Sequence, residues 1–404
     1  MQGAVTNELG ATVLNVEVAV TDPNNQLIES TVANGDFTIN DIATCEDITV
    51  SLDKKDDYGN GITTFDMLLI LKHILNIEQF DSPYKYIAAD VNRNNSISTA
   101  DLVAIRKVIL GIESTFPNNT SWRFVDANYE FLDNNPLDED FPETLTINLS
   151  NDINLNFVGV KVGDVNGTAD NSSPAEGTLV SATERKAQAL TFQTTDRNVV
   201  AGETYTIPFE AQSANAIIGY QFTMNYSSDV LDFETINTSK TLTAENIAMQ
   251  DGMIRASWND IAAVDATTLD FALTFTAKEN GRLSELLSIQ SNPTKAEAYD
   301  EALAILPLAL TFIQPEATDF QLYQNNPNPF TGTTLIGFNL PANSAIQLNI
   351  FDVTGKALRT IDGQYNKGYN TIDLDVAALN ATGVLYYQLH TEFGSLTKKM
   401  MVVD

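Results

Sequence analysis

Oxygen-bearing side chains at alternate positions open a short stretch in the first third of the chain. Asp90, Asn92 and Asn94 are separated by one residue each, and Asp101 closes the stretch eleven residues after Asp90. A twelve-residue calcium loop takes its oxygen ligands from positions one, three, five, seven and twelve, the seventh through a backbone carbonyl. The spacing therefore predicts a Ca²⁺ site with the ligands Asp90, Asn92, Asn94, Ser96 and Asp101.

The sixth position of this loop departs from the usual pattern. Calcium loops place glycine there because the chain turns sharply, and this sequence has Asn95 instead. Asparagine tolerates the left-handed backbone conformation, so the turn is expected to survive. A polar turn rich in Asp and Asn that binds no metal is the alternative interpretation.

A weaker copy of the loop and its helix lies upstream, over residues 55–77. Its closing carboxylate would be Asp66, which lies 35 residues (101 − 66) before Asp101. After each closing aspartate, apolar residues recur with the spacing of one helix face, and two such helices bury these faces against each other. The positions on the two faces are Met67, Ile70, Ile74 and Ile77 in the first copy and Leu102, Ile105, Ile109 and Ile112 in the second.

Ligands are harder to assign in the first copy. Counting back from Asp66 puts Lys55 at the first position and Gly59 at the fifth, and neither side chain is a calcium ligand. A shifted register still offers carboxylates and an amide to a cation. The ligands predicted for this loop are Asp57, Asn60 and Asp66.

The residues just before each closing aspartate are further candidates. Thr64 and Thr99 stand at equivalent places and are predicted to cap the two helices. The two copies together resemble a type I dockerin, the calcium-binding module that docks onto cohesin domains in cellulosomes. That resemblance implies that Thr64, Phe65, Thr99 and Ala100 recognise a partner. For Phe65, burial as a hydrophobic staple at the helix start is an equal alternative.

The charge of the chain limits the classes of partner that it is expected to bind. The sequence has 53 Asp and Glu residues against 22 Lys and Arg, which gives a net charge near −31. Such a surface repels nucleic acid and anionic membranes, so neither is a predicted partner. No run of eighteen apolar residues is present, so no membrane-spanning helix is expected either.

Catalytic motifs are missing from the sequence. The two histidines, His73 and His390, lie in separate regions without a motif around them. The single cysteine, Cys45, stands in a strand-like stretch and is expected to be a small buried residue rather than a nucleophile. There is no HExxH motif, no GxSxG motif and no paired-carboxylate motif. The chain is therefore predicted not to be an enzyme.

The first 187 residues divide into four predicted segments. Residues 1–52 alternate apolar and polar side chains and resemble a carboxypeptidase-regulatory-like β-sandwich. Residues 53–113 form the dockerin-like pair, and residues 114–170 return to strands that are expected to pack with both. Residues 171–187 are polar and rich in helix- and strand-breaking residues, which predicts a linker.

The sequence GDVNG at Gly163–Gly167 imitates the start of a third calcium loop. Its twelfth position would be Ala175, which is not a ligand, and no helical pattern follows. A plain turn that leads into the linker is the favoured interpretation.

Residues 188–315 read as a third unit. Their strong alternation, with no long helical stretch, predicts a β-sandwich. The run Ile218–Tyr226, together with Trp258 and Ala296–Tyr299, resembles the cohesin domain. That resemblance implies a non-catalytic sandwich whose exposed sheet binds a dockerin. A carbohydrate-binding or purely structural module of the same fold is the alternative, so polysaccharide is a candidate ligand.

Residues 319–404 carry the most specific motifs. They include NNPNPF at Asn325–Phe330, FDVTGK at Phe351–Lys356 and a basic pair at Lys398–Lys399. This region resembles the type A C-terminal sorting domain of the type IX secretion system of Bacteroidota. The resemblance implies an address that the secretion machinery reads, and a secreted or outer-surface location. It also implies an export leader, which Met1 does not begin. The chain is therefore expected to lack its original start.

The predicted fold class is mainly β, with several β-sandwiches and one small all-α, calcium-binding helix pair. The first predicted function is a non-catalytic secreted or surface protein (an adhesin, scaffold or matrix component) stabilised by Ca²⁺. Its dockerin-like and cohesin-like units would pair within or between chains, and permanent packing of the helices on the flanking sandwiches is the simpler alternative. The second predicted function is a set of accessory modules of a larger secreted hydrolase whose catalytic domain is absent from this chain.

Overall fold

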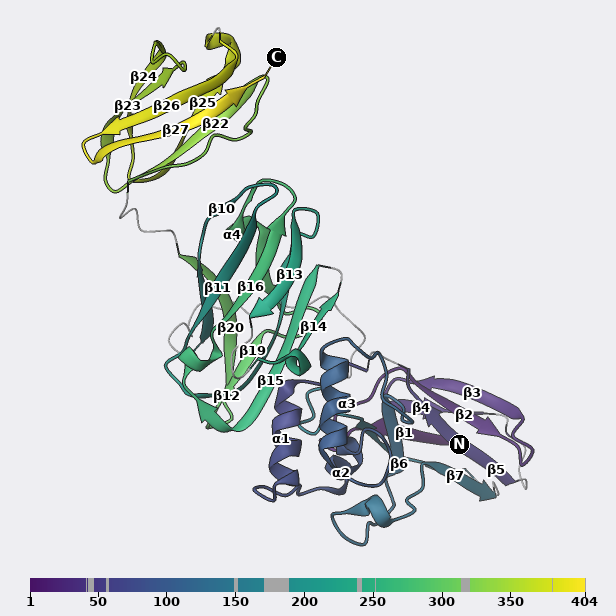
Figure 1. Cartoon of the computed structure of the whole chain (residues 1–404). Helices are drawn as coiled ribbons and strands as arrows, with labels where there is room; N and C mark the ends of the chain where they lie inside the picture. Colours follow the sequence, from purple (N-terminus) through teal and green to yellow (C-terminus); the bar gives the residue numbers. More distant parts are fainter. Residues whose placement is uncertain are drawn as a thin grey trace. The chain divides into compact units, whose positions relative to one another are not determined.

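The structure is a computed structural model of the 404-residue chain. It describes residues 1–40, 42, 47–55, 58–148, 152–170, 189–237, 242–250, 252–313, 320–379 and 381–403. The chain forms two compact units, whose elements are labelled in Figure 1: Met1–Thr194 with Asn198–Phe312, and Thr195–Arg197 with Ile313–Asp404. Each unit has a hydrophobic core of its own.

Two four-stranded sheets form an N-terminal sandwich in the first unit. One sheet has the order β4–β1–β8–β6, with the strands Asp36–Thr38, Gln2–Thr6, Phe157–Lys161 and Trp122–Asp126. The other has the order β3–β2–β5–β7, with the strands Leu27–Ala33, Val16–Thr21, Asp47–Asp53 and Thr144–Asn148. Strands from before and after the helices therefore share both sheets, and the helical segment is inserted into one sandwich (Figure 1).

The alternation of apolar and polar residues along the strands explains why they form a sandwich. Val16, Val18 and Val20 are fully buried along β2, while Glu17 between them is exposed. Side chains of a strand point alternately to opposite faces, so the valines reach the core and the glutamate reaches water. Trp122 and Phe157 of the opposite sheet complete the same core.

Three helices lie between the strands: α1 (Thr64–Ile74), α2 (Pro83–Ala89) and α3 (Thr99–Ile109). Met67 and Ile70 of α1 share one core with Leu102 and Ile105 of α3, as the apolar spacing predicted. The same core includes Val125 and Val160 from the N-terminal sandwich, so the helices pack on that sandwich too. We call α1, α2, α3 and their connecting loops the loop–helix module.

The predicted caps were wrong by one residue. Thr63 and Ser98 are the N-caps, and Thr64 and Thr99 are the first helical residues. A capping box pairs the cap with the side chain three positions later. That side chain is Asp66 in α1 and Asp101 in α3, so the cap must stand three residues before each aspartate.

The predicted helix faces were also too long. Ile77 and Ile112 lie beyond the helix ends and are 55% and 54% exposed. Asn76 and Gly111 have positive φ angles of 58° and 70°, and such residues end helices. The first three positions of each predicted face therefore reach the core, and the fourth does not.

The second sandwich of this unit is built from one ten-stranded sheet that folds over its own core. Its path is β13–β16–β11–β9–β20–β19–β12–β15–β14, and β18 pairs with β12. The bounds in path order are Leu231–Asn237, Phe271–Ala277, Thr204–Gln212, Leu190–Thr195, Ile305–Ile313, Glu297–Asp300, Ile217–Tyr226, Met253–Val264, Ile247–Gln250 and, for β18, Leu287–Gln290. The short pair β10 (Asn198–Val199) and β17 (Gly281–Arg282) and the helix α4 (Leu283–Leu286) lie outside the path.

Aromatic rings fill the core of this second sandwich. Phe192 of β9 contacts both Phe222 of β12 and Phe271 of β16, with ring centroids 5.6 Å and 5.1 Å apart. Phe222 and Phe271 also contact each other, with ring centroids 6.3 Å apart, although β12 and β16 lie five strands apart along the sheet path. The sheet therefore folds over its own core. The mainly β fold class is confirmed.

The second unit is a small antiparallel sandwich. One sheet has β21 (Gln321–Leu322), β22 (Thr333–Leu340) and β25 (Gly368–Asp375). The other has β24 (Ala357–Tyr365), β23 (Ser344–Phe351), β26 (Gly383–Thr391) and β27 (Gly394–Val402). Asn325 fixes the lead-in segment: its backbone N–H donates to the Tyr387 hydroxyl at 2.9 Å and its side-chain amide donates to Thr334 at 3.0 Å.

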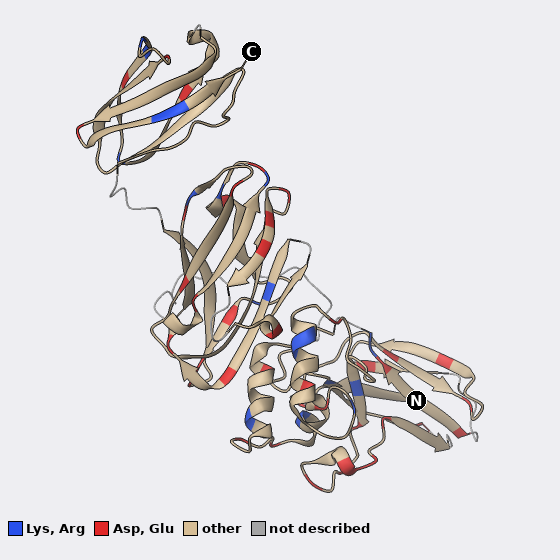
Figure 2. Ribbon diagram, in the orientation of Figure 1, with Lys and Arg blue, Asp and Glu red and all other residues tan. Residues whose placement is uncertain are grey.

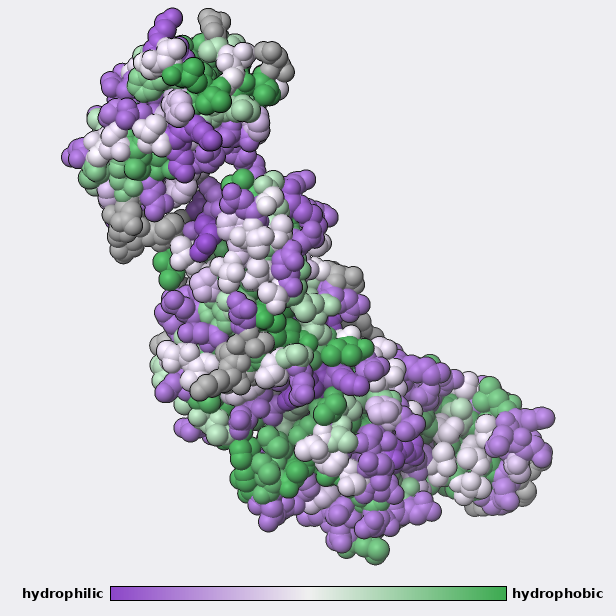
Figure 3. All heavy atoms as spheres, viewed as in Figure 1, coloured by the Kyte–Doolittle hydropathy of each residue, from purple (hydrophilic) through white to green (hydrophobic). Residues whose placement is uncertain are grey.

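The surface agrees with the acidic composition. Figure 2 shows Asp and Glu spread over strand ends and loops of both units, with few Lys and Arg between them. In Figure 3, an apolar patch lies at the C-terminal end of α1, where Leu75 and Ile77 are about half exposed. Among the described residues, no helix combines the length and the apolar character that crossing a bilayer requires.

Candidate metal sites and docking interface

The predicted second calcium loop runs from the end of α2 to the start of α3. Asp90 is fully buried, and its two carboxylate oxygens accept backbone N–H bonds from Asn94 at 3.0 Å and Asn95 at 2.9 Å. Asn95 has a φ angle of 62°, the left-handed conformation expected of it. The loop therefore wraps tightly around the first carboxylate.

Asp101 closes the loop from the first turn of α3. It is fully buried, and it accepts N–H bonds from Asn92 at 3.3 Å and from the cap residue Ser98 at 2.9 Å. Burial and, to a smaller degree, the charge of Asp90 raise the pKa of Asp101. Burial and a neighbouring carboxylate both disfavour the ionised form of a carboxyl. A cation or further hydrogen-bond donors must offset these two effects if the carboxyl is to be ionised.

The remaining predicted ligands differ in their surroundings. The Asn92 side-chain oxygen is buried and has no hydrogen-bond donor within the described part of the chain. Asn94 is exposed, and its side-chain oxygen accepts the N–H of Ser96 at 2.9 Å. A buried amide oxygen without a donor is costly unless something else satisfies it, and a hard cation would do so.

Neighbouring strands hold this loop from outside. The Asn119 side chain donates to the backbone carbonyls of Asp90 at 3.1 Å and Val91 at 3.3 Å. Arg93 in the loop pairs with Glu143 at 3.0 Å, and Glu143 also accepts from Arg123. The loop is thus fixed to the β6 and β7 side of the N-terminal sandwich.

The first loop is built differently from its prediction. Asp66 closes it, but the segment that faces Asp66 comes from much later in the sequence. One Asp66 oxygen accepts the N–H groups of Val165 at 3.0 Å and Asn166 at 3.3 Å, and Asn166 lies 100 residues after Asp66. The other oxygen accepts the Thr63 N–H at 2.9 Å. We call residues 164–170 together with Asp66 the split loop.

Asp164 plays the part in the split loop that Asp90 plays in the contiguous one. Its Oδ1 accepts the N–H of Thr168, four residues on, and its Oδ2 accepts the N–H of Ala169, five residues on, at 3.1 Å and 2.7 Å. Asp90 binds the residues four and five positions after it in the same way.

The closing carboxylates match as well. The residue two places after the opening aspartate donates to the closing aspartate at 3.3 Å in both loops, Asn166 to Asp66 and Asn92 to Asp101. The cap residue donates to the same closing carboxylate at 2.9 Å in both. By this pattern Asn166 corresponds to Asn92.

Two like charges meet at the split loop. Asp66 is fully buried and Asp164 is 7% exposed. Burial raises the pKa of both carboxyls, and the charge of Asp164 raises that of Asp66 further. Within the described part of the chain, the hydrogen-bond donors to these two carboxylates are all N–H or O–H groups of neutral residues.

The other ligands predicted for the first loop lie elsewhere. The Asn60 side chain exchanges two hydrogen bonds with the backbone of Asp170, at 2.9 Å and 3.0 Å, and so supports the split loop from outside. Gly61 packs closely on Ala169: a Cβ added to Gly61 would lie 2.4 Å from the Cα of Ala169. Asp57 lies outside the described residues, as does Cys45.

Sequence reasoning missed Asp164 and Asn166 as members of a loop. The signal was present in GDVNG at Gly163–Gly167, which was interpreted as a plain turn because its own twelfth residue is not a ligand. The closing carboxylate is supplied by Asp66, which only the fold brings close. Spacing along one segment is therefore a poor guide when a loop is made from two.

Among the described residues, no site gathers three or more His, Cys, Asp or Glu side chains. Each of the two loops brings two carboxylates together with at least one asparagine side chain. Oxygen donors of mixed type and number suit Ca²⁺, whereas Zn²⁺ prefers Cys and His. The residues present thus fit a calcium ion.

The start of α1 lies against the second sandwich within the first unit. The Thr64 N–H donates to the Gln221 side chain of β12 at 2.6 Å, and its hydroxyl shares a hydrogen bond of 2.7 Å with Ser257 of β15. All three residues are at most 1% exposed. Polar groups buried in such matched pairs specify one arrangement of the two surfaces.

Apolar contacts surround these hydrogen bonds. The ring centroid of Phe65 lies 5.2 Å from that of Tyr299, which is fully buried. Leu68 of α1 packs with Ile218 and Tyr299 in a small separate core. Gly219 gives Leu68 room, because a Cβ there would lie 3.2 Å from a Leu68 methyl group.

The end of α3 contacts the same face. Arg106 donates to the Asn259 side chain of β15 at 2.7 Å, and the Thr294 hydroxyl donates to the Ile109 carbonyl at 3.1 Å. The last carbonyls of a helix need outside donors, and Thr294 supplies one. The loop–helix module therefore contacts the sandwich through the first turn of α1 and the last turn of α3. We call this contact the docking interface.

The four residues predicted to recognise a partner separate into two pairs. Thr64 and Phe65 lie in the docking interface. Thr99 and Ala100, at the equivalent places of α3, are exposed. Gln221 lies in the run Ile218–Tyr226 that carried the cohesin resemblance. Neither Gln221 nor Ser257 was singled out as a contact residue, because polar side chains on strands usually face water.

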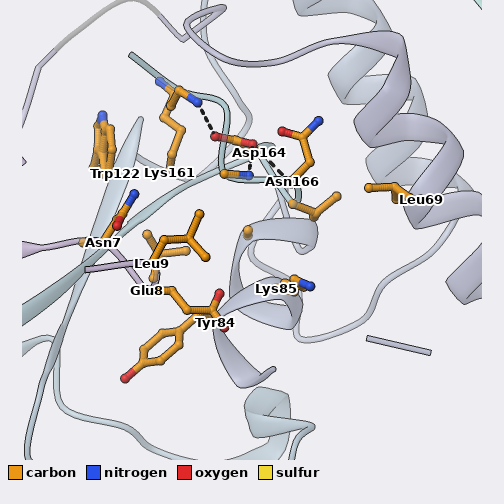
Figure 4. Close-up of a pocket in the computed structure, with 16 residues that line it drawn as sticks. Asn7, Glu8, Leu9, Leu69, Tyr84, Lys85, Trp122, Lys161, Asp164 and Asn166 are labelled. Carbon is orange, nitrogen blue, oxygen red and sulfur yellow. Dashed lines mark hydrogen bonds between the residues drawn. The ribbon is translucent and has the colours of Figure 1, made fainter. Parts of the chain in front are cut away.

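A cavity of about 280 Å³ opens beside the split loop. Leu9, Tyr84 of α2 and Trp122 of β6 lie around it, and Asp164 and Asn166 line its inner edge (Figure 4). The lining is mainly apolar, and the polar groups nearest the split loop are occupied by its own hydrogen bonds.

Several solved cohesins resemble part of the chain. The sixth cohesin of scaffoldin B from Acetivibrio cellulolyticus, solved with a mutant Cel5 dockerin, is 16% identical, with a TM-score of 0.24 over 31% of this chain and 100% of that chain. A non-cellulosomal cohesin from Archaeoglobus fulgidus is 16% identical, with a TM-score of 0.23 over 30% and 86%. The type II cohesin dyad of the ScaA scaffoldin from A. cellulolyticus is 10% identical, with a TM-score of 0.24 over 54% and 97%. All three TM-scores are low.

The C-terminal unit is matched at the level of a protein family. No curated protein matches the chain in sequence. Residues 325–403 match the family described as the secretion system C-terminal sorting domain. This agrees with the type IX sorting motifs of the sequence and with the antiparallel sandwich that residues 320–403 form. The C-terminal unit is therefore a type IX secretion sorting domain, and the protein is secreted or displayed on the cell surface.

Proposed function

We propose that this protein is a non-catalytic surface or secreted module array, an adhesin, scaffold or matrix component, that two calcium ions stabilise. In the proposal its dockerin-like module and cohesin-like sandwich pair within the chain. One observation carries it: two buried pairs of carboxylates, Asp90 with Asp101 and Asp164 with Asp66, are held at the helix starts by the same hydrogen-bond pattern.

Calcium would be held at each loop by this chain's own oxygens. In the contiguous loop these are Asp90, Asn92, Asn94, the Ser96 carbonyl and Asp101, and in the split loop Asp164, Asn166 and Asp66. A bound calcium ion supplies positive charge and cross-links its ligands. The charge would offset the repulsion between the two carboxylates of each loop, and the cross-link would fasten each helix start to its loop.

Export and display support the rest of the proposal. The sorting domain addresses the chain to the secretion machinery, and the outside of a cell provides calcium that a cytosol lacks. Stacked sandwiches joined by a metal-bound helix module make a spacer that needs no disulfide, which suits a chain with a single cysteine. A dockerin, a cohesin, a second copy of the chain or a polysaccharide are the partners that such an array would take.

Thermal unfolding with and without calcium tests the proposal. A ligand that binds only the folded chain adds about 2.7 kcal/mol at a hundredfold excess over its dissociation constant. We expect Ca²⁺ to raise the Tm of the metal-free chain, and Mg²⁺ at the same concentration to raise it less. Asp101→Ala and Asp164→Ala should each remove part of the increase. An unchanged Tm in millimolar Ca²⁺ would contradict the proposal.

A hydrolase accessory role is the competing proposal. It is favoured by the same modules, because they would serve equally to attach a catalytic domain encoded upstream. Release of sugars or peptides by the purified 404-residue chain would contradict the non-catalytic function. Binding of the chain to insoluble polysaccharide, without turnover, would favour the accessory role over adhesion.

A further inference from the structure

The cavity beside the split loop has walls from four elements of the first unit. Its apolar lining comes from α1, α2, β6 and β8, through Leu69, Ala88, Trp122 and Val160. An apolar cavity of ~150 Å³ holds one benzene molecule, so the volume of about 280 Å³ leaves room here for about ten non-hydrogen atoms. Ligand pockets are mostly apolar and use a few polar groups to fix the ligand. The lining therefore suits a small apolar body, and the polar groups around it decide which charge that body can carry.

A tight turn of the chain forms one side of the cavity's rim. The Asn7 side chain accepts the Ala11 N–H at 2.8 Å, which holds this turn closed. Leu9 at its tip is 73% exposed, yet it contacts the split loop: a Cβ added to Gly167 would lie 2.9 Å from a Leu9 methyl group. The turn therefore holds both Leu9 and its neighbour Glu8 at the rim.

Four charged side chains line the cavity, and they are Glu8, Lys85, Lys161 and Asp164. The Lys85 ammonium pairs with Asp81 at 2.6 Å. Lys161 is 4% exposed, and its ammonium donates to the Ser121 hydroxyl. Asp164 accepts the backbone N–H groups of the split loop. The charges of these three side chains are therefore engaged within the chain.

Glu8 differs from the other three charged side chains. It is exposed, and its carboxylate forms no hydrogen bond or ion pair with any described residue. Burial raises the pKa of the Tyr84 hydroxyl, and the charges of Glu8 and Asp126 raise it further, so Glu8 lies close enough to Tyr84 to act on it. Within the described structure, the one charge at the cavity that is free to meet a ligand is therefore negative.

The two ends of the cavity differ in their chemistry. Figure 4 shows Trp122 and Asp164 at one end and Glu8 and Tyr84 at the other, with Leu9 between them. The Asp164 carboxylate is bound by its own loop, which leaves Glu8 as the carboxylate that a ligand can reach. The net charge of the chain, near −31, adds attraction for cations and repulsion of anions.

We propose that the cavity binds a small organic cation, with an apolar body of about ten non-hydrogen atoms and one ammonium group. The body packs against Leu69 and Trp122, and the ammonium pairs with the Glu8 carboxylate beside the Tyr84 hydroxyl. Apolar contact supplies most of the affinity, because an ion pair at an exposed carboxylate contributes little. The carboxylate supplies the preference for a cation over a neutral or anionic body of the same shape. This binding is independent of the calcium sites proposed above.

Titration of the intact chain with phenethylamine tests the proposal. This probe has a phenyl ring on a short chain that ends in an ammonium group at neutral pH. Phenethyl alcohol has the same shape without the charge, and hydrocinnamate carries a carboxylate instead of the ammonium. We expect isothermal titration in calcium-containing buffer to give a single site for the amine and a dissociation constant about fivefold larger for the alcohol. Hydrocinnamate should not bind at the same concentrations.

Two variants and a matched control locate the site. Glu8→Gln should weaken the binding of phenethylamine to the level of phenethyl alcohol. Ala88→Leu fills the apolar part of the cavity and should abolish the binding of both. Glu17→Gln changes an exposed glutamate of β2 outside the cavity lining, and it should leave both dissociation constants unchanged. Thermal unfolding shows whether each variant is folded, and the two glutamate variants decide the test if Ala88→Leu does not fold.

Each outcome counts for or against this site. A preference for the amine that Glu8→Gln removes and Glu17→Gln keeps would support it. Failure of the native chain to bind phenethylamine, or equal affinities for amine and alcohol, would contradict it. Equal losses in Glu8→Gln and Glu17→Gln would also contradict it, because the amine would then respond only to net charge. The calcium titration is a separate measurement, so failure of either proposal leaves the other standing.

Discussion

Four aspartates account for the local chemistry of the first unit. Asp90 and Asp164 open a loop and Asp101 and Asp66 close one, and each closing residue belongs to the capping box of a helix. The same carboxylate thus ends a loop and begins a helix. Burial raises the pKa of Asp66, Asp101 and Asp164, so the ionised forms of these three carboxyls depend on hydrogen bonds and on a cation.

The caps give a prediction at single residues. Ser98→Ala removes the side-chain acceptor of the first α3 turn and should lower the free energy of unfolding by about 1 kcal/mol. Thr99→Ala, one residue on and exposed, should change it by less than about 0.5 kcal/mol. Urea denaturation of both variants measures the difference. A larger effect of Thr99→Ala than of Ser98→Ala would mean that the helix begins one residue later than described.

The raised pKa values give a prediction about pH. A carboxyl whose folded-state pKa lies above its unfolded value, about 3.9 for aspartate, contributes stability below that value and loses it as the pH rises through the folded pKa. For Asp66, Asp101 and Asp164 the pKa is raised, so ionisation destabilises the metal-free chain as the pH rises. Calcium favours the ionised form and removes this cost.

We therefore expect the increase in Tm on adding calcium to the dialysed chain to be larger at pH 7 than at pH 5. Differential scanning fluorimetry at both values measures it. A constant increase across this range would argue that these carboxyls are not the ligands.

At the scale of elements, the sequence predicted the helices, the strands and the contiguous loop better than it predicted their partners. The apolar spacing after Asp66 and Asp101 located α1 and α3, because helix faces are a local property. The third helix, α2, escaped notice because its seven residues carry too little periodicity. The split loop and the docking interface join segments far apart in the chain, and only the fold brings them together.

Equivalent positions on the two helices give the matching prediction. Leu68 and Val103 each lie two residues after a closing aspartate, yet Leu68 is 1% exposed and Val103 is 52% exposed. Leu68→Ala should cost about 2–4 kcal/mol, because it leaves a cavity in the docking interface. Val103→Ala should cost less than about 0.5 kcal/mol. Chemical denaturation of the pair would reveal whether the two helices are as unequal as their contacts.

At the scale of the whole molecule, the candidate metal sites and the export address lie in different units. The first unit contains the candidate metal sites and the docking interface, and the second is the sorting domain. The two have separate cores, so each should fold without the other. The sequence identified the sorting domain directly, because its motifs are local and specific.

Removing residues 320–404 tests this division. We expect the shortened chain to be retained inside cells of a host with a type IX secretion system, since it lacks the address. Its Tm and its response to calcium should match those of the intact first unit. Secretion of the shortened chain, measured by fractionation and immunoblotting, would mean that the first unit carries a second export signal.

The number of calcium ions bound tests the central claim most directly. Isothermal titration of the metal-free chain should give two calcium ions for the native sequence and one for each of Asp164→Ala and Asp101→Ala. Asp164 is the decisive residue for this test, because it would bind calcium only if the split loop is a calcium site. One calcium ion in the native chain, unchanged by Asp164→Ala, would contradict the split site.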